Sequence, residues 1–318
     1  MTHRERFIHA LECRKPAAGR VPHFELVFFL TMEAFGKVHP HHRRYSQWDQ
    51  MSEHERQLHR EEIADIYIMT AETYGHSAIF LHPRPHTDDE IRRTIDIVRG
   101  RTGDEYFLLM HGDATFSVPH GDSMVEFSCR LADDPDGLKE EAEKNVDNRL
   151  EWAAGLKGAG LDGFGLCADY CFNTGPFLSP EQFSEFVAPY LRRLVQGYRE
   201  MGYYVIKHTD GNIMPILDDL LAAEPHALHS IDPQGGVDIA EVKKRAGDSV
   251  CLIGNVSCAA LDTGTDEEII ESARYCLQHG MEGGGYIFST SNCIYTGMDL
   301  SRYELMLDVW REEGNYPE

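Results

Sequence analysis

Basic residues are scarce in this sequence. Its 30 lysines and arginines stand against 53 aspartates and glutamates, so the formal net charge is −23. Nucleic acids and anionic membranes are recognised through basic surfaces, and this balance therefore argues against both as partners. It also disfavours a polyanionic substrate, unless a local basic pocket reverses the overall field.

Long apolar stretches are missing as well. The longest run lies near residues 26–30 and is far shorter than the roughly 20 residues that a membrane-spanning helix needs. The opening residues 1–5 show no apolar segment of a secretory signal. We therefore expect a soluble, cytoplasmic protein.

The eight cysteines lack the close spacing of a small disulfide-stabilised domain. In a large cytoplasmic chain such thiols are usually reduced and packed in the core. We expect this of Cys13, Cys129, Cys251, Cys258 and Cys276. Cys167 and Cys171 are four residues apart, which favours a structural role over metal binding. Cys293 follows a polar segment, where a thiolate ligand or nucleophile is an alternative to packing.

A strand-then-helix alternation runs through the chain. Short apolar runs of the kind that form buried parallel strands occur at residues 21–28, 77–81, 106–111, 163–169, 203–208, 227–232, 250–255 and 285–289. One helix is predicted from Ser179, which forms a capping box with Gln182, through Leu194. Further helices are predicted at residues 135–158, 212–224, 238–246, 265–280 and 301–313.

The order of these elements indicates a single α/β domain over residues 1–318. We predict a (β/α)8 TIM barrel with an N-terminal helical extension, in which a helix over residues 4–12 covers the bottom. A doubly wound open sheet is the main alternative. That fold usually carries a glycine-rich turn after its first strand, whereas this chain has Phe28-Phe29-Leu30-Thr31 there.

Polar residues collect where the predicted strands end, and loops at these ends build the active sites of such barrels. They are Glu25, His82, His111, Asp113, Asp169, His208, Asp210, Asp232, Asn255 and the run 289–293. Any one of them could instead cap a helix or bind loop backbone. Their shared position is what points to a site.

The segment His208-Thr209-Asp210-Gly211 follows an apolar strand directly. If strand geometry persists, the imidazole and the carboxylate point the same way and could bind a metal or relay a proton. Asp210 could equally cap the following helix. The histidine-rich tract 39–44 has the composition of a metal site, but we expect a solvated loop because nothing apolar near it would fix its geometry.

Several segments are similar to those of one known family. They are residues 4–7, 20–22, 174–180, 208–212, 231–233, 237–239, 252–256 and 283–289. In these segments the chain resembles the uroporphyrinogen decarboxylase superfamily, whose fold is a (β/α)8 barrel. The resemblance implies one of two activities. One branch decarboxylates the acetate arms of uroporphyrinogen without a cofactor. The other moves methyl groups to or from a corrinoid carried by a separate small protein, or to a thiol, and commonly uses zinc.

The chain departs from the decarboxylase branch at three places. That branch holds its substrate carboxylates with an arginine-rich segment after the first strand, where this chain has the acidic and apolar residues 23–29. The decarboxylase aspartate on the second strand falls near His82, and its late histidine falls near Asn292. The methyltransferase branch is therefore the better match.

That branch implies a zinc site. Its thiol-methylating members bind zinc through a His-x-Cys pair and a later cysteine; here the pair reads His208-Thr209-Asp210, and Cys293 lies one residue beyond the late position. We predict that His208, Asp210 and Cys293 hold Zn²⁺, since carboxylate oxygen is an acceptable ligand. A zinc ion with fewer thiolates is harder, which suits a methylated oxygen or nitrogen better than a thiol.

We therefore predict a methyltransferase that demethylates a small methoxy compound or methylamine and passes the methyl group to a corrinoid protein. Glu25, His111 and Asp169 are the predicted catalytic residues, which orient the substrate or supply a proton. The predicted substrate-binding residues are Phe24, Phe28, His82, Tyr170 and Asn292. Two alternatives stay open: a metal-free decarboxylase or lyase acting on a small carboxylic acid or tetrapyrrole, and a non-catalytic binding protein.

Overall fold

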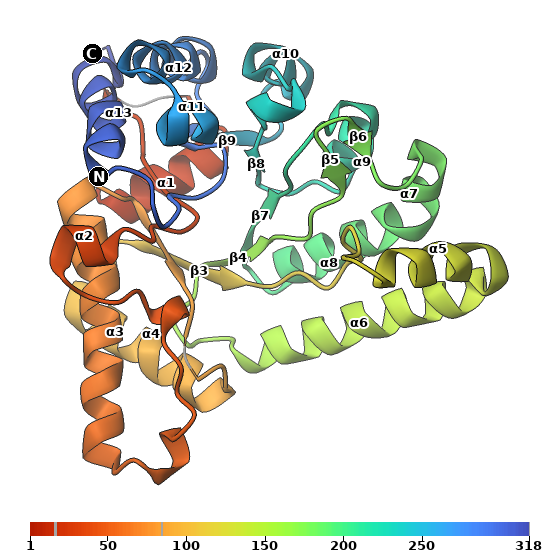
Figure 1. The fold of residues 1–318 in the computed structure, drawn as a ribbon, viewed down its shortest axis with the longest axis horizontal. Coiled ribbons are helices and arrows are strands. Elements are labelled where there is room, and N and C mark those ends of the chain that lie inside the picture. Colours follow the sequence, from red (N-terminus) through yellow and green to blue (C-terminus); the bar gives the residue numbers. More distant parts are fainter. Residues whose placement is uncertain (16–17, 84, 318) are drawn as a thin grey trace.

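A curled parallel sheet forms the centre of the protein (Figure 1). The computed structural model describes residues 1–15, 18–83 and 85–317. Within them the sheet runs in the order β10-β9-β8-β7-β4-β3-β2. Its strands are β2 (Ala78–Leu81), β3 (Phe107–His111), β4 (Gly163–Leu166), β7 (Tyr204–His208), β8 (Ala227–Ser230), β9 (Cys251–Val256) and β10 (Tyr286–Thr290). Each lies within a residue or so of a predicted strand, except that β4 and β8 end earlier.

The segment around His23 closes the sheet into a (β/α)8 barrel. His23 makes parallel bridges to His76, beside β2, and to Phe288 of β10. The predicted strand over residues 21–28 was wrong as a continuous strand, because only isolated bridges form there. Pro22 has no N–H to donate to a neighbouring strand, and the Phe24 N–H carries the bond to the Phe288 carbonyl instead (3.1 Å).

Helices surround the sheet on its outer side (Figure 1). They are α2 (Thr31–Phe35), α3 (Glu53–Tyr74), α4 (Asp88–Thr102), α5 (Ser123–Asp133), α6 (Pro135–Gly155), α7 (Pro180–Phe186), α8 (Ala188–Glu200), α9 (Leu217–Ala222), α10 (Ile239–Ala246), α11 (Cys258–Thr263), α12 (Asp266–Gly280) and α13 (Leu300–Glu313). Two small antiparallel pairs were not predicted: β1 (Gly19–Arg20) with β11 (Asn315–Tyr316), and β5 (Cys171–Phe172) with β6 (Gly175–Pro176). No helix in the described part of the chain is long and apolar enough to cross a membrane.

Proline divides two of the predicted helices. The capping box of Ser179 and Gln182 is present, but the helix it begins ends at Phe186, and α8 starts immediately after Val187. Pro189 explains the break, because proline inside a helix lacks an N–H and clashes with the carbonyl four residues before it. The predicted helix over 212–224 likewise becomes a short 3₁₀ turn containing Pro215, followed by α9.

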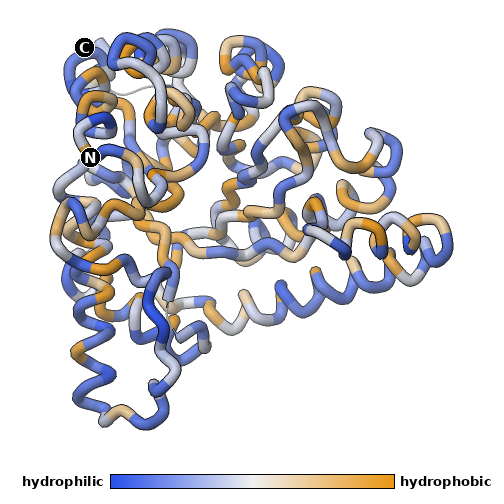
Figure 2. Tube along the Cα trace, viewed as in Figure 1, coloured by the Kyte–Doolittle hydropathy of each residue, from blue (hydrophilic) through white to orange (hydrophobic). Residues whose placement is uncertain are grey.

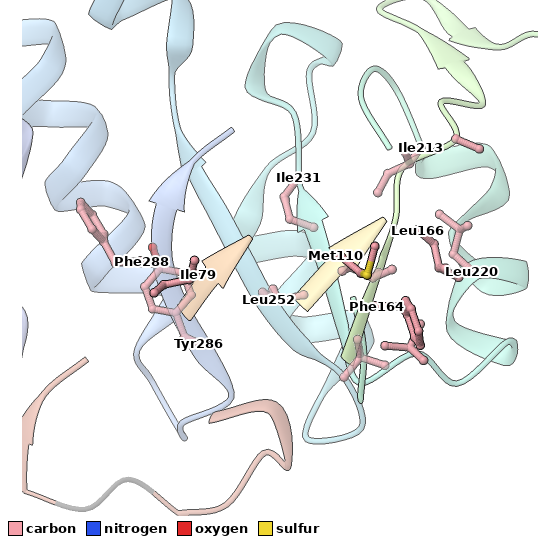
Figure 3. Close-up of a cluster of buried hydrophobic side chains, with 14 of the residues drawn as sticks. Ile79, Met110, Phe164, Leu166, Ile213, Leu220, Ile231, Leu252, Tyr286 and Phe288 are labelled. Atoms are coloured by element: carbon pink, nitrogen blue, oxygen red, sulfur yellow. The ribbon is translucent and has the colours of Figure 1, made fainter. Parts of the chain in front are cut away.

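Apolar side chains alternate between two core layers, one on each face of the sheet. In β3, Leu108 and Met110 face the outer helices, whereas Phe107 and Leu109 point into the barrel. Figure 3 shows part of the outer layer, and the strands at the centre of Figure 2 are correspondingly rich in apolar residues. This period of two determines which polar side chains at the strand ends enter the barrel.

A helix covers the bottom of the barrel, as predicted. It is α1 (His3–Leu11), and Phe7 on it is fully buried. The Phe7 ring packs against Phe24 and against Phe107, the first residue of β3, with ring centroids 5.6 and 4.8 Å apart. Apolar side chains therefore fill the barrel at the N-terminal ends of its strands, and the polar side chains lie at the C-terminal ends.

Candidate metal site and active centre

Three of the predicted polar side chains meet at the C-terminal ends of β4 and β7. Asp169, His208 and Asp210 each offer one ligand atom, and these atoms lie within 4.8 Å of one another. His208 Nε2 lies 3.8 Å from Asp169 Oδ1 and 3.7 Å from Asp210 Oδ1. His208 is buried, whereas Asp169 remains partly exposed, so the group opens toward solvent on the Asp169 side.

The Asp210 carboxylate is held on both sides. Ser230 Oγ donates to its Oδ1 (2.7 Å), and the side-chain amide of Asn292 donates to its Oδ2. Its own backbone N–H donates to Asp169 Oδ1 (3.0 Å). Burial, together with the neighbouring Asp169 carboxylate, raises the pKa of Asp210 to about 7. Asp210 is therefore poised to hold or release a proton near neutral pH.

A chain of buried polar side chains runs inward from His208. His208 Nδ1 lies 2.7 Å from His229 Nδ1, His229 Nε2 lies 3.4 Å from Ser289 Oγ, and Ser289 Oγ donates to Glu25 Oε2 (3.4 Å). Burial lowers the pKa of both imidazoles, so both are neutral at pH 7. In one tautomer His208 carries its proton on Nδ1 and donates a hydrogen bond to His229. Its Nε2 is then unprotonated and faces Asp169 and Asp210, as a metal ligand requires.

Glu25 lies at the inner end of this chain, buried beneath the mouth. Its carboxyl group accepts hydrogen bonds from the Thr290 N–H (3.2 Å) and the Thr290 hydroxyl. Burial outweighs these bonds and raises the pKa of Glu25 to about 8. Glu25 is thus protonated at neutral pH and reaches the His208 group only through Ser289 and His229.

The substitution Glu25→Gln is expected to change how stability depends on pH. With an ordinary pKa of 4.5 and a folded value of about 8, the folded protein holds one more proton than the unfolded chain between these pH values. Stability of the wild type should therefore fall as pH rises from about 4.5 to 8. Glutamine carries no titrating proton, so denaturant midpoints measured at about pH 5.5 and pH 8 should differ less in the variant than in the wild type. An equal pH dependence would contradict a protonated Glu25.

A buried ion pair supports the loops on the outer side of β7. Lys207 is fully buried; its Nζ donates to Asp113 Oδ2 (3.0 Å) and to the Ala168 carbonyl (2.8 Å), and lies 4.0 Å from the centroid of the Tyr170 ring. Burial alone would raise the pKa of Asp113, but the Lys207 ammonium and the bonds from Thr115 hold it below its usual value. The pair fixes the segment that carries Asp169.

A cavity of about 470 Å³ adjoins the metal-binding group. Asp210 and Asn292 lie in its wall, beside Asp232, Asp262 and Tyr295. Asp232 is already engaged, because it accepts backbone N–H bonds from Gly211 and Gln234. The cavity has room for a small substrate, and its lining is acidic on the side that faces Asp210.

His82 and His111, two further predicted site residues, are paired with each other. Their Nε2 atoms lie 3.1 Å apart at the ends of β2 and β3. The structure therefore divides the predicted residues at the mouth between two groups, one around His208 on β7 and one around His82 and His111. Neither His82 nor His111 belongs to the group of Asp169, His208 and Asp210.

The histidine-rich tract over residues 39–44 was predicted as a solvated loop, and this is wrong for His39. His39 is buried, and the Phe29 ring meets it edge-on with centroids 5.0 Å apart. Sequence distance did not reveal that this apolar ring packs on it.

Predicted aromatic wall residues lie elsewhere in the fold. Phe24 packs on Phe7 at the barrel bottom, and Phe28 packs against the rings of Tyr74 and Tyr303 in the core. Tyr170 is buried under Lys207, and its hydroxyl group bonds Thr115 Oγ1 (2.6 Å). Among the predicted substrate-binding residues, only Asn292 lies in the wall of the large cavity.

Three cysteines were predicted to lie near the site: Cys167, Cys171 and Cys293. None of them belongs to the group of Asp169, His208 and Asp210. Cys293 is buried in the core of the barrel, and burial raises the pKa of its thiol well above the usual value. Cys171 is buried too, with a pKa raised to about 12, and Cys167 is half-buried with its pKa raised by burial. The third side chain beside His208 and Asp210 is therefore Asp169, which was predicted as a catalytic residue, and not Cys293.

Two residues that complete the site were not predicted. Lys207 is a charge inside the apolar run 203–208, and His229 is a histidine inside the apolar run 227–232. Each interrupts an otherwise apolar strand, which is the signal that could have found it. The pairing of His208 with His229 also depends on strand register, since the two are direct neighbours across β7 and β8.

Comparisons with known proteins show which family and which fold the chain is similar to. The model of the family described as Uroporphyrinogen decarboxylase (URO-D) matches residues 122–313. The uroporphyrinogen decarboxylase of Chlorobium phaeovibrioides is 29% identical over 143 residues, 43% of this chain and 39% of that protein. That of Pseudoalteromonas translucida is 24% identical over 208 residues, 63% and 55% of the two chains. The matches thus span from about two fifths to just over half the length of these relatives.

One solved structure is similar over nearly its whole length. It is a methyltransferase from Methanosarcina mazei, with a TM-score of 0.74 and 18% sequence identity, and the match covers 98% of this chain and 99% of that one. At this identity the likeness concerns the fold. It supports the barrel architecture from the N-terminal helix to α13.

Proposed function

Because the chain belongs to the uroporphyrinogen decarboxylase family, with more than half of its length matched, we propose that it is a methyltransferase of that family. In this proposal it takes a methyl group from a small methoxy compound or methylamine and delivers it to a corrinoid carried by a separate protein. The observation that carries the proposal is the group of Asp169, His208 and Asp210 beside a cavity of about 470 Å³.

The three side chains fit a zinc ion. Zinc bound at about 2.1 Å in tetrahedral geometry separates two ligand atoms by about 3.4 Å. His208 Nε2 lies 3.7 and 3.8 Å from the two carboxylate oxygens, so small side-chain movements complete the geometry. When bound there, zinc would act as a Lewis acid on the oxygen or nitrogen that carries the methyl group.

The residues of the chain then position the substrate, and the demethylated atom takes up a proton. The cavity holds the substrate with its methylated atom toward Asp210 and Asn292. As the methyl carbon leaves, that oxygen or nitrogen keeps the bonding electron pair and takes up a proton. The cavity admits solvent, which supplies this proton, because Asp210 is deprotonated when it binds zinc. Ser230 and Asn292 hold the Asp210 carboxylate in place.

The decarboxylase alternative has less support in the cavity. The curated relatives are named uroporphyrinogen decarboxylases, and the resemblance to that branch implies a substrate with several acetate arms. The cavity beside Asp210 is lined by Asp210, Asp232 and Asp262 among others, and the described residues of its wall include no lysine or arginine. Such a lining repels a polyanion, whereas it accepts a neutral ether or a protonated amine.

The test is demethylation by the purified chain with a cobalt(I) corrinoid. Methoxy compounds, methylamines and methyl thioethers are offered separately, with and without a chelator. We expect methyl transfer from an ether or an amine that stops on chelation and returns with added zinc. Failure with all three classes would overturn the proposal. Corrinoid-independent release of CO₂ from a carboxylic acid that survives chelation would favour the lyase, and tight ligand binding without turnover would favour a binding protein.

A further inference from the structure

Two histidines on neighbouring strands face each other inside the barrel. His208 ends β7, His229 lies on β8, and the parallel register makes them direct cross-strand partners. Their ring centroids are 4.9 Å apart, and the two Nδ1 atoms are 2.7 Å apart. Burial lowers the pKa of both rings, so each ring carries a single proton. At 2.7 Å one Nδ1 must donate that proton to the other, because two unprotonated nitrogens would repel each other.

The group behind His229 determines which of the two rings donates. His229 Nε2 lies 3.4 Å from Ser289 Oγ, and the Ser289 hydroxyl donates to Glu25 Oε2 (3.4 Å). A serine hydroxyl has only one hydrogen to donate, so its oxygen acts as an acceptor toward His229. His229 then carries its proton on Nε2, and its Nδ1 is free to accept the proton on His208 Nδ1.

The opposite direction leaves one proton without a partner. In that case Glu25 donates to Ser289, His229 donates to His208, and the His208 proton lies on Nε2. The nearest carboxylate oxygens to His208 Nε2 are those of Asp169 and Asp210, at 3.8 and 3.7 Å. These distances exceed the length of a hydrogen bond. With the proton on His208 Nδ1, by contrast, every N–H and O–H from His208 to Ser289 has an acceptor.

We propose that His229 is a positioning residue of the candidate metal site. It accepts the Nδ1 proton of His208 and so leaves His208 Nε2 unprotonated toward Asp169 and Asp210. Ligating histidines commonly give their second ring proton to a carboxylate, a carbonyl or a water molecule, and here another imidazole takes that place. This inference rests on the proposed function, because zinc bound there is the ion that His208 would hold.

The tautomer is measured on the metal-free protein. Full-length chain labelled with ¹⁵N in its histidines is studied by long-range ¹H–¹⁵N correlation, which distinguishes the Nδ1–H and Nε2–H forms of each ring. The His208 signals are identified by their loss in His208→Gln. We expect His208 protonated on Nδ1 and His229 protonated on Nε2. A His208 ring protonated on Nε2 would overturn the proposal.

Two variants of His229 distinguish its role as acceptor from its role in packing. His229→Leu fills much of the same volume but cannot accept a proton, whereas the side-chain amide oxygen in His229→Gln can. We expect His229→Leu to lose the Nδ1–H form of His208 and to bind zinc about 10- to 100-fold more weakly, measured by competition with a chelating dye. His229→Gln should recover part of both.

A histidine at the other end of the same strand gives the matched control. His226 directly precedes β8, and its Nδ1 accepts the Val205 N–H (3.0 Å). His226→Gln should leave both the tautomer of His208 and the affinity for zinc unchanged. Far-ultraviolet circular dichroism checks that each variant is folded, and the wild-type tautomer tests the proposal without any variant of His229.

Zinc binding and the tautomer of His208 separate this inference from the proposed function. Equal zinc affinity in the wild type and His229→Leu would overturn the positioning role and leave the metal site in place. An equal loss in His229→Leu and His229→Gln would also overturn it, because packing would then be what His229 supplies. If the wild type binds no zinc, the proposed function fails. A tautomer of His208 that changes in His229→Leu would still support the role of His229, and an unchanged one would overturn it.

Discussion

His208→Ala is expected to remove one equivalent of zinc and to stop methyl transfer. The His208 imidazole is buried between two carboxylates, so it would be the central ligand of the proposed ion, and its other nitrogen lies against His229. Changes to groups that only orient metal ligands cost about 10- to 100-fold in affinity or activity, so loss of a ligand should lower turnover by more than about 100-fold. Elemental analysis and the cobalt(I) demethylation assay give the two measurements.

A histidine far from the mouth provides the control for that variant. His279 lies half-buried in the last turn of α12, and His279→Ala should keep both zinc and activity. Zinc retained in His208→Ala would show that the metal binds elsewhere. Zinc lost with turnover retained would mean that the metal is not used in the reaction, and acid–base chemistry by Asp210 and Asp169 would become the better explanation.

Lys207→Met is expected to produce the largest loss of stability. Methionine fills a similar volume but leaves Asp113 as a buried, uncompensated charge, since the side chain of Asp113 is only 14% exposed. Breaking one side of such a pair costs about 3–5 kcal/mol in the free energy of unfolding. Urea unfolding followed by circular dichroism should show a correspondingly lower midpoint.

Two further variants identify the cause of that loss. Lys207→Met combined with Asp113→Asn removes the orphaned charge and should recover part of the stability. Lys139 pairs with Glu185 on the surface, and Lys139→Met should change the midpoint little, because solvent screens that pair. A double variant no more stable than Lys207→Met would show that lost packing, and not the charge, is responsible.

The fold was largely predictable because its signal is local. Buried parallel strands are short apolar runs, and the seven strands of the described sheet were found in this way. The exception was the segment around His23, whose bridges depend on partners at both ends of the chain. The break between α7 and α8 was also readable, since Pro189 is visible in the sequence and its effect on a helix is known.

The site was predictable in part, for a physical reason. Placement at strand ends brought Asp169, His208 and Asp210 to one edge, but it could not tell which face of each loop a side chain takes. Cys293 and Asn292 are adjacent in sequence, yet Asn292 bonds Asp210 and Cys293 turns into the core. The neighbours His229 and Lys207 depend on strand register and on alternation between core layers, which no single segment reveals.

The closing seam of the barrel has a consequence for synthesis on the ribosome. Phe24 bonds Phe288, and Gly19–Arg20 pairs with Asn315–Tyr316, so the first residues of the barrel find their partners near the end of the chain. Contacts of such long sequence separation form late and slow folding. The segment around His23 can meet His76 beside β2 early, but its bridge to Phe288 waits for β10. Until that last strand leaves the exit tunnel, the nascent barrel has open edges that can associate with other chains.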